Sequence, residues 1–456
     1  MARAPVAPGV TPRRLALYAL PALPLAALAL PFYVIVPSFY AEALGLSLAS
    51  VGTALLAIRI LDALADPLLG WASDRFNPAM GRRRALMLLA TPVTAISAFM
   101  VFWPGAGAGI AYLVLWGLGL SLGYTALSLA YTAWGAEISP DYRGRARVVA
   151  AREGVTLLGT LLAIALPFAV GLGSGAAGFH GLAAMGVFVL IVLPLASLAC
   201  VAGVPEPTDR TRERLGMRAG LRHLTANRPF LRLIAAFLLN GIANAIPATL
   251  FLYFVADRIG AAALQGPLLF LYFLCAVAGL PLALRCATRF GKHRAWCGAM
   301  LVACLVFASA GWLGPGDVVP FALICAATGL LLAFDVALPP AIQADVIDVD
   351  TAASGEQRSG LYFALWALAT KLALAIAVGV TFPLLDWAGY QPGTGTPSAE
   401  AGAALAMLYA WLPIPAKLAA IALMWGFPLD EAAQARLRRE IDAGAGPAVV
   451  APRTQL

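Results

Sequence analysis

The stretch Arg59-Ile-Leu-Asp62-Ala-Leu-Ala-Asp66-Pro-Leu-Leu-Gly70 decides how the rest of the chain is interpreted. It places one basic and two acidic side chains inside an apolar run that extends from 48 to 72. A run of this length is sufficient for a helix to cross the roughly 30 Å hydrocarbon core of a bilayer. An ionisable side chain at that depth costs roughly 2.5–3.5 kcal/mol on insertion scales, so such residues usually serve a function. The stretch therefore predicts a membrane helix that carries a functional centre.

The composition of the whole chain agrees with this interpretation. Hydrophobic residues make up 61% and charged residues 12% of the 456 residues, whereas soluble domains average about 45–50% and about 25%. So few charges cannot cover the surface of a water-soluble protein of this size, and the net charge of +8 is interpreted against lipid rather than nucleic acid. The six cysteines show neither CxxC spacing nor histidine partners, so we expect no disulfide framework and no thiolate metal site.

Twelve apolar runs predict an all-α membrane protein with twelve transmembrane helices. The runs lie near 15–37, 48–72, 85–103, 109–137, 153–172, 180–203, 229–255, 265–284, 295–313, 318–344, 360–384 and 403–426. With the N-terminus placed in the cytoplasm, Arg258 is the one basic residue of the 31 that falls in an outside loop. Because Lys and Arg concentrate in cytoplasmic loops, we expect both termini in the cytoplasm.

A long basic segment after the sixth run divides the chain into two parts. We expect an N-terminal six-helix half at 1–205, a cytoplasmic linker at 206–228, a C-terminal six-helix half at 229–430 and a cytoplasmic tail at 431–456. The halves resemble each other, because a glycine with flanking basic residues (Gly81 and Gly291) follows the second run of each. This pattern favours a pseudo-symmetric transporter with its site at the midplane. The alternative is that the basic loops only set the topology.

Six ionisable side chains lie well inside the runs, and their charges sum to zero. Asp62 and Asp66 are spaced i, i+4, so they lie one turn apart on one helix face. Two carboxylates in one low-dielectric pocket repel each other, so one must hold a proton or both must share a cation such as Na⁺. Arg59 can hold one of them ionised. The alternative is a structural Arg–Asp pair that only joins helices.

The remaining intramembrane polar residues leave several alternatives open. Lys371 is either a mobile counter-ion for the acidic pair or a permanent partner of Asp335. Lys417 is less informative, because a lysine at this depth can extend toward the cytoplasmic surface. Asn240 and Asn244, again one turn apart, line a solute cavity or bond between helices. Arg152 contacts a solute or is the last of the cytoplasmic topology charges.

The residues around Asp62 resemble the signature of the glycoside–pentoside–hexuronide cation symporters. This branch of the major facilitator superfamily includes melibiose permease and is similar to the sodium-dependent lysophospholipid transporters. The first matching motif continues from Gly70 through Asp74-Arg75 to Gly81-Arg82-Arg83-Arg84. The second matching motif is Pro339-Pro-Ala-Ile-Gln343-Ala-Asp345-Val-Ile-Asp348, followed by Gly355, Arg358, Gly360 and Lys371.

The resemblance implies a major facilitator fold and a role for particular residues. Asp62 and Asp66 take the cation-coordinating positions, Lys371 that of the family's intramembrane lysine, and Arg152 that of an arginine near the sugar. Melibiose permease-like members hold sugar hydroxyls with acids on the first and fourth spans, whereas the matching fourth-span stretch here is Gly123-Tyr-Thr125-Ala-Leu-Ser128. This departure argues against a simple glycoside and leaves open a more apolar or amphipathic solute, or a sugar bound by Asn240, Asn244 and Gln343. Arg152 and Thr125 are the other candidates for the solute cavity.

We expect a secondary active transporter that couples Na⁺ or H⁺ to symport of a sugar, glycoside or amphipathic solute by alternating access. A cytoplasmic gate would be built from ion pairs that form and break, among the residues Asp74, Arg75, Arg82, Arg83, Arg84, Asp345, Asp348 and Arg358. The alternatives are a proton-driven exporter or lipid translocator on the same fold, and a non-transporting receptor. An enzyme is not expected, because no HExxH or GxSxG motif is present.

The expected setting is the bacterial inner membrane, with a monomeric protein. Its partners would be a small-molecule solute and membrane lipids, without nucleic acid. No cofactor is expected besides the coupling ion, and Asp62 and Asp66 would hold Na⁺ if the protein is sodium-coupled.

Overall fold

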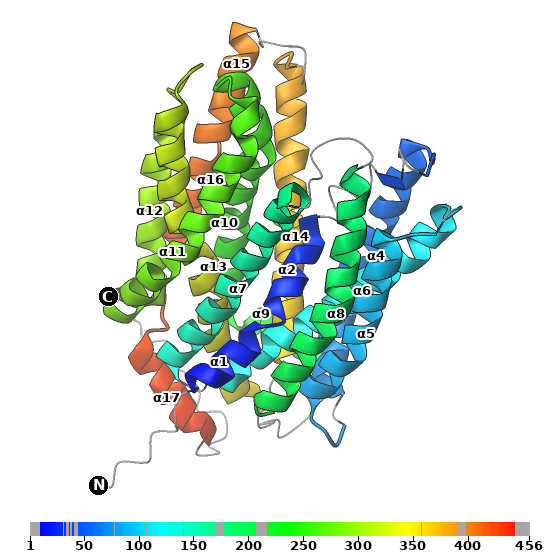
Figure 1. Ribbon diagram of the computed structural model, residues 1–456. Coiled ribbons are helices and arrows are strands. Elements are labelled where there is room, and N and C mark those ends of the chain that lie inside the picture. Colours follow the sequence, from blue (N-terminus) through cyan, green and yellow to red (C-terminus); the bar gives the residue numbers. More distant parts are fainter. Residues whose placement is uncertain are drawn as a thin grey trace.

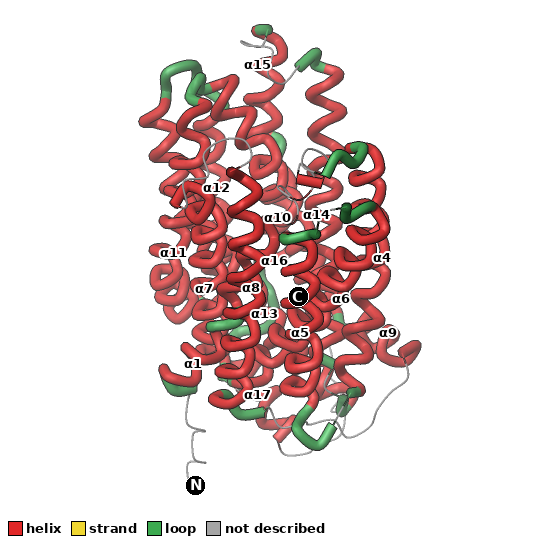
Figure 2. Tube along the Cα trace, turned by 45° about the vertical axis from the view of Figure 1, so that its right-hand side comes forward, coloured by secondary structure: helices red, strands yellow, loops and turns green. Residues whose placement is uncertain are grey.

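The computed structural model describes residues 10–30, 32, 36, 39–40, 44–76, 78–105, 107–139, 141–169, 177–206, 217–356, 358–390 and 398–442. Within these ranges the regular elements are all helices (Figure 2). Nine of them are long and apolar enough to cross a membrane. The helices that correspond to the second and fifth predicted runs carry several charged side chains each, and the first predicted run lies partly outside the described residues. The twelve-helix all-α fold is confirmed.

The helices of the first half follow the predicted runs. They are α1 (Pro12–Ala19), α2 (Ala22–Leu30), α4 (Leu48–Arg75), α5 (Arg82–Phe102), α6 (Ile110–Ile138), α7 (Tyr142–Ala169) and α8 (Ala177–Gly203). A short helix, α9 (Met217–Ala226), lies in the segment predicted as a linker.

The second half repeats this arrangement, with irregular turns at one end. Its elements are α10 (Arg228–Tyr253), η2 (Phe254–Arg258), η3 (Ala262–Leu264), α11 (Gln265–Phe290), α12 (Lys292–Ala310), α13 (Val318–Ser354), α14 (Ser359–Trp387), α15 (Ala399–Ala406), η4 (Met407–Trp411) and α16 (Pro413–Met424). The segment predicted as a tail contains α17 (Glu431–Asp442), which packs on α13 and α7.

Two predicted boundaries are wrong by about ten residues. The fifth run was placed from 153, but α7 begins at Tyr142, and the tenth was placed up to 344, but α13 continues to Ser354. Both extensions carry polar and charged side chains that are buried against other helices, including Arg145 and Asp348. A prediction from hydropathy therefore ends these helices too early, because it stops at charged side chains that pair with other helices in the folded protein.

The two halves lie side by side in one upright bundle (Figure 1). Helices α10, α11, α12 and α16 gather on one side and α4, α5, α6 and α8 on the other, with α2, α7 and α14 between them. Across the boundary, α14 packs on α4 and α6, and α7 packs on α11 and α13. Gly81 (φ +98°) and Gly291 (φ +88°) stand at the same position, directly before α5 and α12, where a positive φ favours glycine.

We call the end of the bundle that holds α1, α9, α17 and the α4–α5 loop the basic end. Helix α14 is sealed at this end, because its first six residues, 359–364, are all buried. Further along the same helix, Leu372, Leu374 and Val380 are exposed. The halves are therefore closed together at the basic end, and α14 becomes more accessible toward the opposite end.

Candidate functional site

The ammonium group of Lys371 lies between the two carboxylates of α4. Lys371 Nζ is 2.5 Å from Asp62 Oδ2 and 2.8 Å from Asp66 Oδ2. The Asp66 side chain is fully buried, whereas the Lys371 side chain is 35% exposed. The i, i+4 spacing of the acids places them on one face of α4, and α14 supplies the lysine from the other half. The site therefore spans the boundary between the halves.

Thr125 of α6 completes this cluster from the first half. Its hydroxyl donates a hydrogen bond of 2.8 Å to Asp62 Oδ1. Sequence reasoning assigned Thr125 to the solute cavity, but the structure places it on the acidic pair. Two carboxylates and one ammonium leave one negative charge, and carboxylate and hydroxyl oxygens are the donors that a hard cation prefers. The donor set fits one Na⁺ or one proton.

Lys371, and not Asp335, is placed beside the two acids, and Arg59 stays a predicted partner of the pair. Arg59 is exposed on α4, and Lys371 lies between the two acids. Asp335 pairs with Lys417 instead of with Lys371. Of the two alternatives for Lys371, the structure supports the counter-ion of the acidic pair.

Asp335 is the centre of a second polar cluster, inside the C-terminal half. It accepts hydrogen bonds from Trp296 Nε1 (2.6 Å), Asn244 Nδ2 (3.0 Å) and Asn240 Nδ2 (3.2 Å). Lys417 Nζ donates to the Asn240 and Asn244 side-chain oxygens, both at 2.7 Å, and lies 3.4 Å from Asp335 Oδ2. The prediction that Lys417 extends toward the membrane surface is wrong, because these acceptors hold it inside the bundle. The cluster is neutral and its polar groups are satisfied.

Two further residues assigned to the solute cavity also bond to other groups of the protein. Arg152 is buried and pairs with Glu153, with Nη2 2.5 Å from Oε1. Gln343 is fully buried near the basic end, where its amide donates to the Tyr362 carbonyl over 2.9 Å. Asn240 and Asn244 likewise bond between helices. Most of the residues predicted to line a solute cavity thus form hydrogen bonds or ion pairs within the protein.

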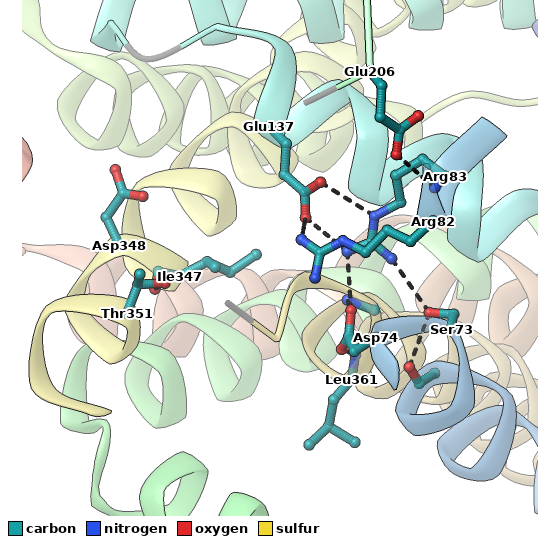
Figure 3. A network of polar contacts seen from close by, with 12 residues as sticks. Ser73, Asp74, Arg82, Arg83, Glu137, Glu206, Ile347, Asp348, Thr351 and Leu361 are labelled. Carbon is teal, nitrogen blue, oxygen red and sulfur yellow. Dashed lines mark hydrogen bonds and ion pairs between the residues drawn. The ribbon is translucent and has the colours of Figure 1, made fainter. Parts of the chain in front are cut away.

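At the basic end, Arg83 holds the first of two charge networks (Figure 3). Its guanidinium lies 2.6 Å from Glu137 Oε1 and 2.9 Å from Asp74 Oδ1, and Arg82 adds a contact of 3.0 Å to Glu137. Glu206 accepts hydrogen bonds from the backbone N–H groups of Arg83 and Arg84 at 2.9 and 3.1 Å. These acids satisfy the free N–H groups and the positive charge at the start of α5.

Asp74 also joins the two halves directly. Its two carboxylate oxygens accept the backbone N–H groups of Gly360 and Leu361, each at 2.9 Å. A Cβ atom on Gly360 would come within 2.2 Å of Ser73 Oγ and 2.7 Å of the Gly70 carbonyl oxygen. Only glycine allows α4 and α14 to approach this closely, so Asp74 can cap α14 from the other half.

The second network joins α7 to α13, α12 and α17. Arg145 Nη1 is 2.8 Å from Asp348 and 3.1 Å from Asp345, and Lys292 Nζ is 2.5 Å from Asp345. Arg438 of α17 contacts the other Asp348 oxygen at 2.9 Å. All the acidic members belong to α13 and Arg145 belongs to the first half, so this network also holds the halves together.

The other predicted gate residues have local contacts. Arg84 donates to the Val204 carbonyl (2.8 Å), Arg75 lies over the Trp71 ring, and Arg358 pairs with Asp350 inside the C-terminal half. Sequence reasoning did not place Glu137, Glu206, Arg145, Lys292 and Arg438 in these networks. An available signal was Glu137 itself, the one acid in the fourth run, placed close to the basic α4–α5 loop.

Comparisons with known proteins agree with this architecture. The chain is 26% identical over 419 residues to a glucuronide carrier protein homolog of Escherichia coli, covering 89% of this chain and 90% of that protein. It is 25% identical over 400 residues to the isoprimeverose transporter of Lactiplantibacillus pentosus, covering 85% and 82%. It is also 25% identical over 438 residues to the human sodium-dependent lysophosphatidylcholine symporter 1, covering 84% and 77%.

Solved structures and a family model lead to the same conclusion. A bacterial homologue of the iron transporter ferroportin, crystallised facing outward, superposes with a TM-score of 0.67 at 15% identity, covering 91% of this chain and 99% of that one. The fucose:proton symporter of E. coli superposes with a TM-score of 0.64 at 14% identity, covering 89% and 97%. The family model described as MFS/sugar transport protein matches residues 17–431, so the chain belongs to the MFS/sugar transport protein family.

Proposed function

We propose that this transporter is a cation-coupled symporter for a small organic solute, with Asp62, Asp66 and Thr125 as the cation site. The observation that carries the proposal is the position of the Lys371 ammonium between two carboxylates of the other half. Asp62, Asp66 and Lys371 together carry one net negative charge between the halves, where a monovalent cation is favoured. Relatives named as symporters, including a sodium-dependent one, support the same activity.

In the proposed mechanism, the cation competes with Lys371 for the acidic pair. The pair lies on α4 and the lysine on α14, so weakening this contact loosens one tie between the halves. Solute binding would then complete the change, and the loaded carrier opens at the basic end by separating Asp74 from α14 and Arg145 from Asp345 and Asp348. Since coupling is reciprocal, cation and solute must raise each other's affinity by the same factor.

The orientation follows from the charge distribution. We place the basic end and both termini in the cytoplasm, because loops rich in Lys and Arg remain on that side. The closed basic end then corresponds to a carrier that faces outward. Inward opening requires Asp74 to leave α14 and Arg145 to leave Asp345 and Asp348. A bacterial inner membrane is the setting that the bacterial relatives support.

The solute is a sugar, a glycoside or an amphipathic molecule. Relatives are named for glucuronide, isoprimeverose and lysophosphatidylcholine, so both chemistries occur among them. Thr125, in the fourth-span stretch where the resemblance expects a sugar-holding acid, bonds to Asp62. Asn240 and Asn244 are bonded to Asp335 and Lys417. An amphipathic solute needs fewer hydrogen bonds and therefore suits this chain better than a free monosaccharide.

A thermal-shift titration of the purified protein tests the cation site. NaCl, KCl and choline chloride are compared across pH, on wild type and on Asp62→Asn, Asp66→Asn. A ligand that binds the folded state raises apparent stability, so we expect Na⁺-specific or pH-dependent stabilisation that the double variant loses. Asp335→Asn is the matched control, because it removes a partly buried acid outside the site and should keep the cation response. Equal responses of wild type and double variant would show that the acids are structural.

Uptake into proteoliposomes separates the rival activities. A symporter accumulates solute with an inward cation gradient, whereas an exporter depletes it, and a receptor moves none and tolerates loss of Asp62 and Asp66.

A further inference from the structure

The two repeats use their equivalent basic loops differently. Before α5, Arg82 and Arg83 are buried and bonded to Glu137, and Arg84 bonds to a backbone carbonyl. Around the start of α12, only Lys292 is buried in this way, against Asp345. The other basic side chains there are exposed: Arg285, Arg289 and Arg294. No carboxylate of the described residues forms an ion pair with any of these three. The second repeat thus exposes arginines at a position where the first repeat buries its arginines in internal contacts.

The surface on either side of these arginines is apolar. On α11, Leu274 and Leu282 are exposed, and on α12 so are Leu301 and Leu305. In a membrane protein, exposed leucines along such helices face acyl chains. The spacing from Leu282 to Arg285 is one turn, so the guanidinium groups begin where this apolar flank ends.

Two large aromatic side chains mark the same level. Phe290, at the end of α11, is 55% exposed, and Trp425, after α16, is 72% exposed. Trp425 belongs to this region because Arg232 donates to its carbonyl, and the neighbouring Phe427 ring lies 6.2 Å from that of His293 on α12. Exposed aromatic residues concentrate at the boundary between acyl chains and water.

We propose that the junction of α11 and α12 binds the headgroups of anionic phospholipids through Arg285, Arg289 and Arg294. We call these three residues the arginine patch. Guanidinium groups bind phosphate oxygens in pairs of parallel hydrogen bonds, which an ammonium group cannot do. An anionic headgroup supplies the missing counter-charge, and its acyl chains run along the leucines of α11 and α12. This proposal does not depend on which ion or solute is transported.

The test uses the full-length protein in nanodiscs made of phosphatidylcholine with increasing phosphatidylglycerol. Lipids that remain bound are counted by native mass spectrometry, and thermal stability is measured in parallel. The patch variant is Arg285→Gln, Arg289→Gln, Arg294→Gln. The matched control variant is Arg13→Gln, Arg14→Gln, Arg228→Gln, which removes three exposed arginines from other helices at the same end.

Each basic residue near an anionic surface contributes about fivefold to binding. We therefore expect the apparent affinity for phosphatidylglycerol to fall by roughly 100-fold in the patch variant and by much less in the control. A triple lysine variant of the patch keeps the charge and the topology, and it should lose an intermediate amount because bidentate contacts disappear. Inorganic phosphate should not compete at millimolar concentration, because it lacks the acyl chains.

Three outcomes would overturn the proposal. Equal losses in the patch and control variants would show general attraction to an anionic surface. An unchanged affinity in the patch variant would show that the arginines only set topology. Full competition by inorganic phosphate would show a free-anion site instead of a lipid site.

Discussion

Replacing Lys371 by methionine tests whether its ammonium and the coupling cation share one site. The substitution keeps an unbranched side chain, one heavy atom shorter than that of lysine, and removes its charge. At an effective dielectric constant of about 20, a charge pair 2.8 Å apart interacts by about 6 kcal/mol. Water screens part of this, because the Lys371 side chain is 35% exposed. We take about 1.4–3 kcal/mol as the free energy by which Lys371 opposes cation binding in wild type. Its removal should therefore raise the cation affinity by a factor of about 10–150.

The assay is cation-dependent thermal stability and direct binding to purified protein. In choline chloride at high pH, Lys371→Met should be less stable than wild type, because two buried carboxylates then face each other without a counter-ion. Added Na⁺ should restore stability, with an apparent Kd at least about tenfold lower than that of wild type. If H⁺ is the coupling ion, the protonation midpoint should move to higher pH, because removing the ammonium favours the neutral acid.

Two further variants make the result interpretable. Asp66→Asn, Lys371→Met returns the cluster to one negative charge and should recover much of the stability. Lys417→Met removes the ammonium of the second polar cluster and should leave the cation affinity unchanged. If Lys371→Met binds the cation no more tightly than wild type, Lys371 does not compete for the site and the proposed coupling is wrong.

Three other substitutions test the ties between helices. Asp74→Asn should speed amide hydrogen exchange at the Gly360 and Leu361 N–H groups at least about tenfold, and unchanged exchange would refute its capping role. Gly360→Ala should open the basic end, because its Cβ would meet Ser73 Oγ at 2.2 Å. The measurement is the rate at which cysteine thiols at that end are labelled, which should increase. Gly379→Ala is the control: it lies on the same helix with nothing within 4 Å of the added Cβ, and it should leave the labelling unchanged. Asp335→Asn should destabilise the protein by about 3–5 kcal/mol, because Lys417 loses its counter-ion. Transport by this variant should keep its dependence on the cation. Loss of that dependence would mean that the second cluster takes part in coupling.

The sequence alone determined the membrane class, the number of spans and the placement of two acids on one face of the second span. Hydrophobic runs must span the bilayer whatever their neighbours are, so composition and run length were sufficient. The i, i+4 spacing of Asp62 and Asp66 was also sufficient to predict that the two acids lie together, since one turn of helix places both carboxylates on one face. Nothing beyond helix geometry was needed for either inference.

Tertiary structure alone decided which charges pair. Lys371 and Lys417 both lie inside apolar runs, and the sequence offers no way to assign one to Asp62 and Asp66 and the other to Asp335. The answer depends on which helices become neighbours: α14 faces α4 across the boundary, whereas α16 faces α10 and α13 inside one half. The same reason explains two contacts of the first half. Thr125 bonds to Asp62, 63 residues away, only once α6 packs on α4. Asp74 caps α14, 286 residues away, only after the two halves have packed.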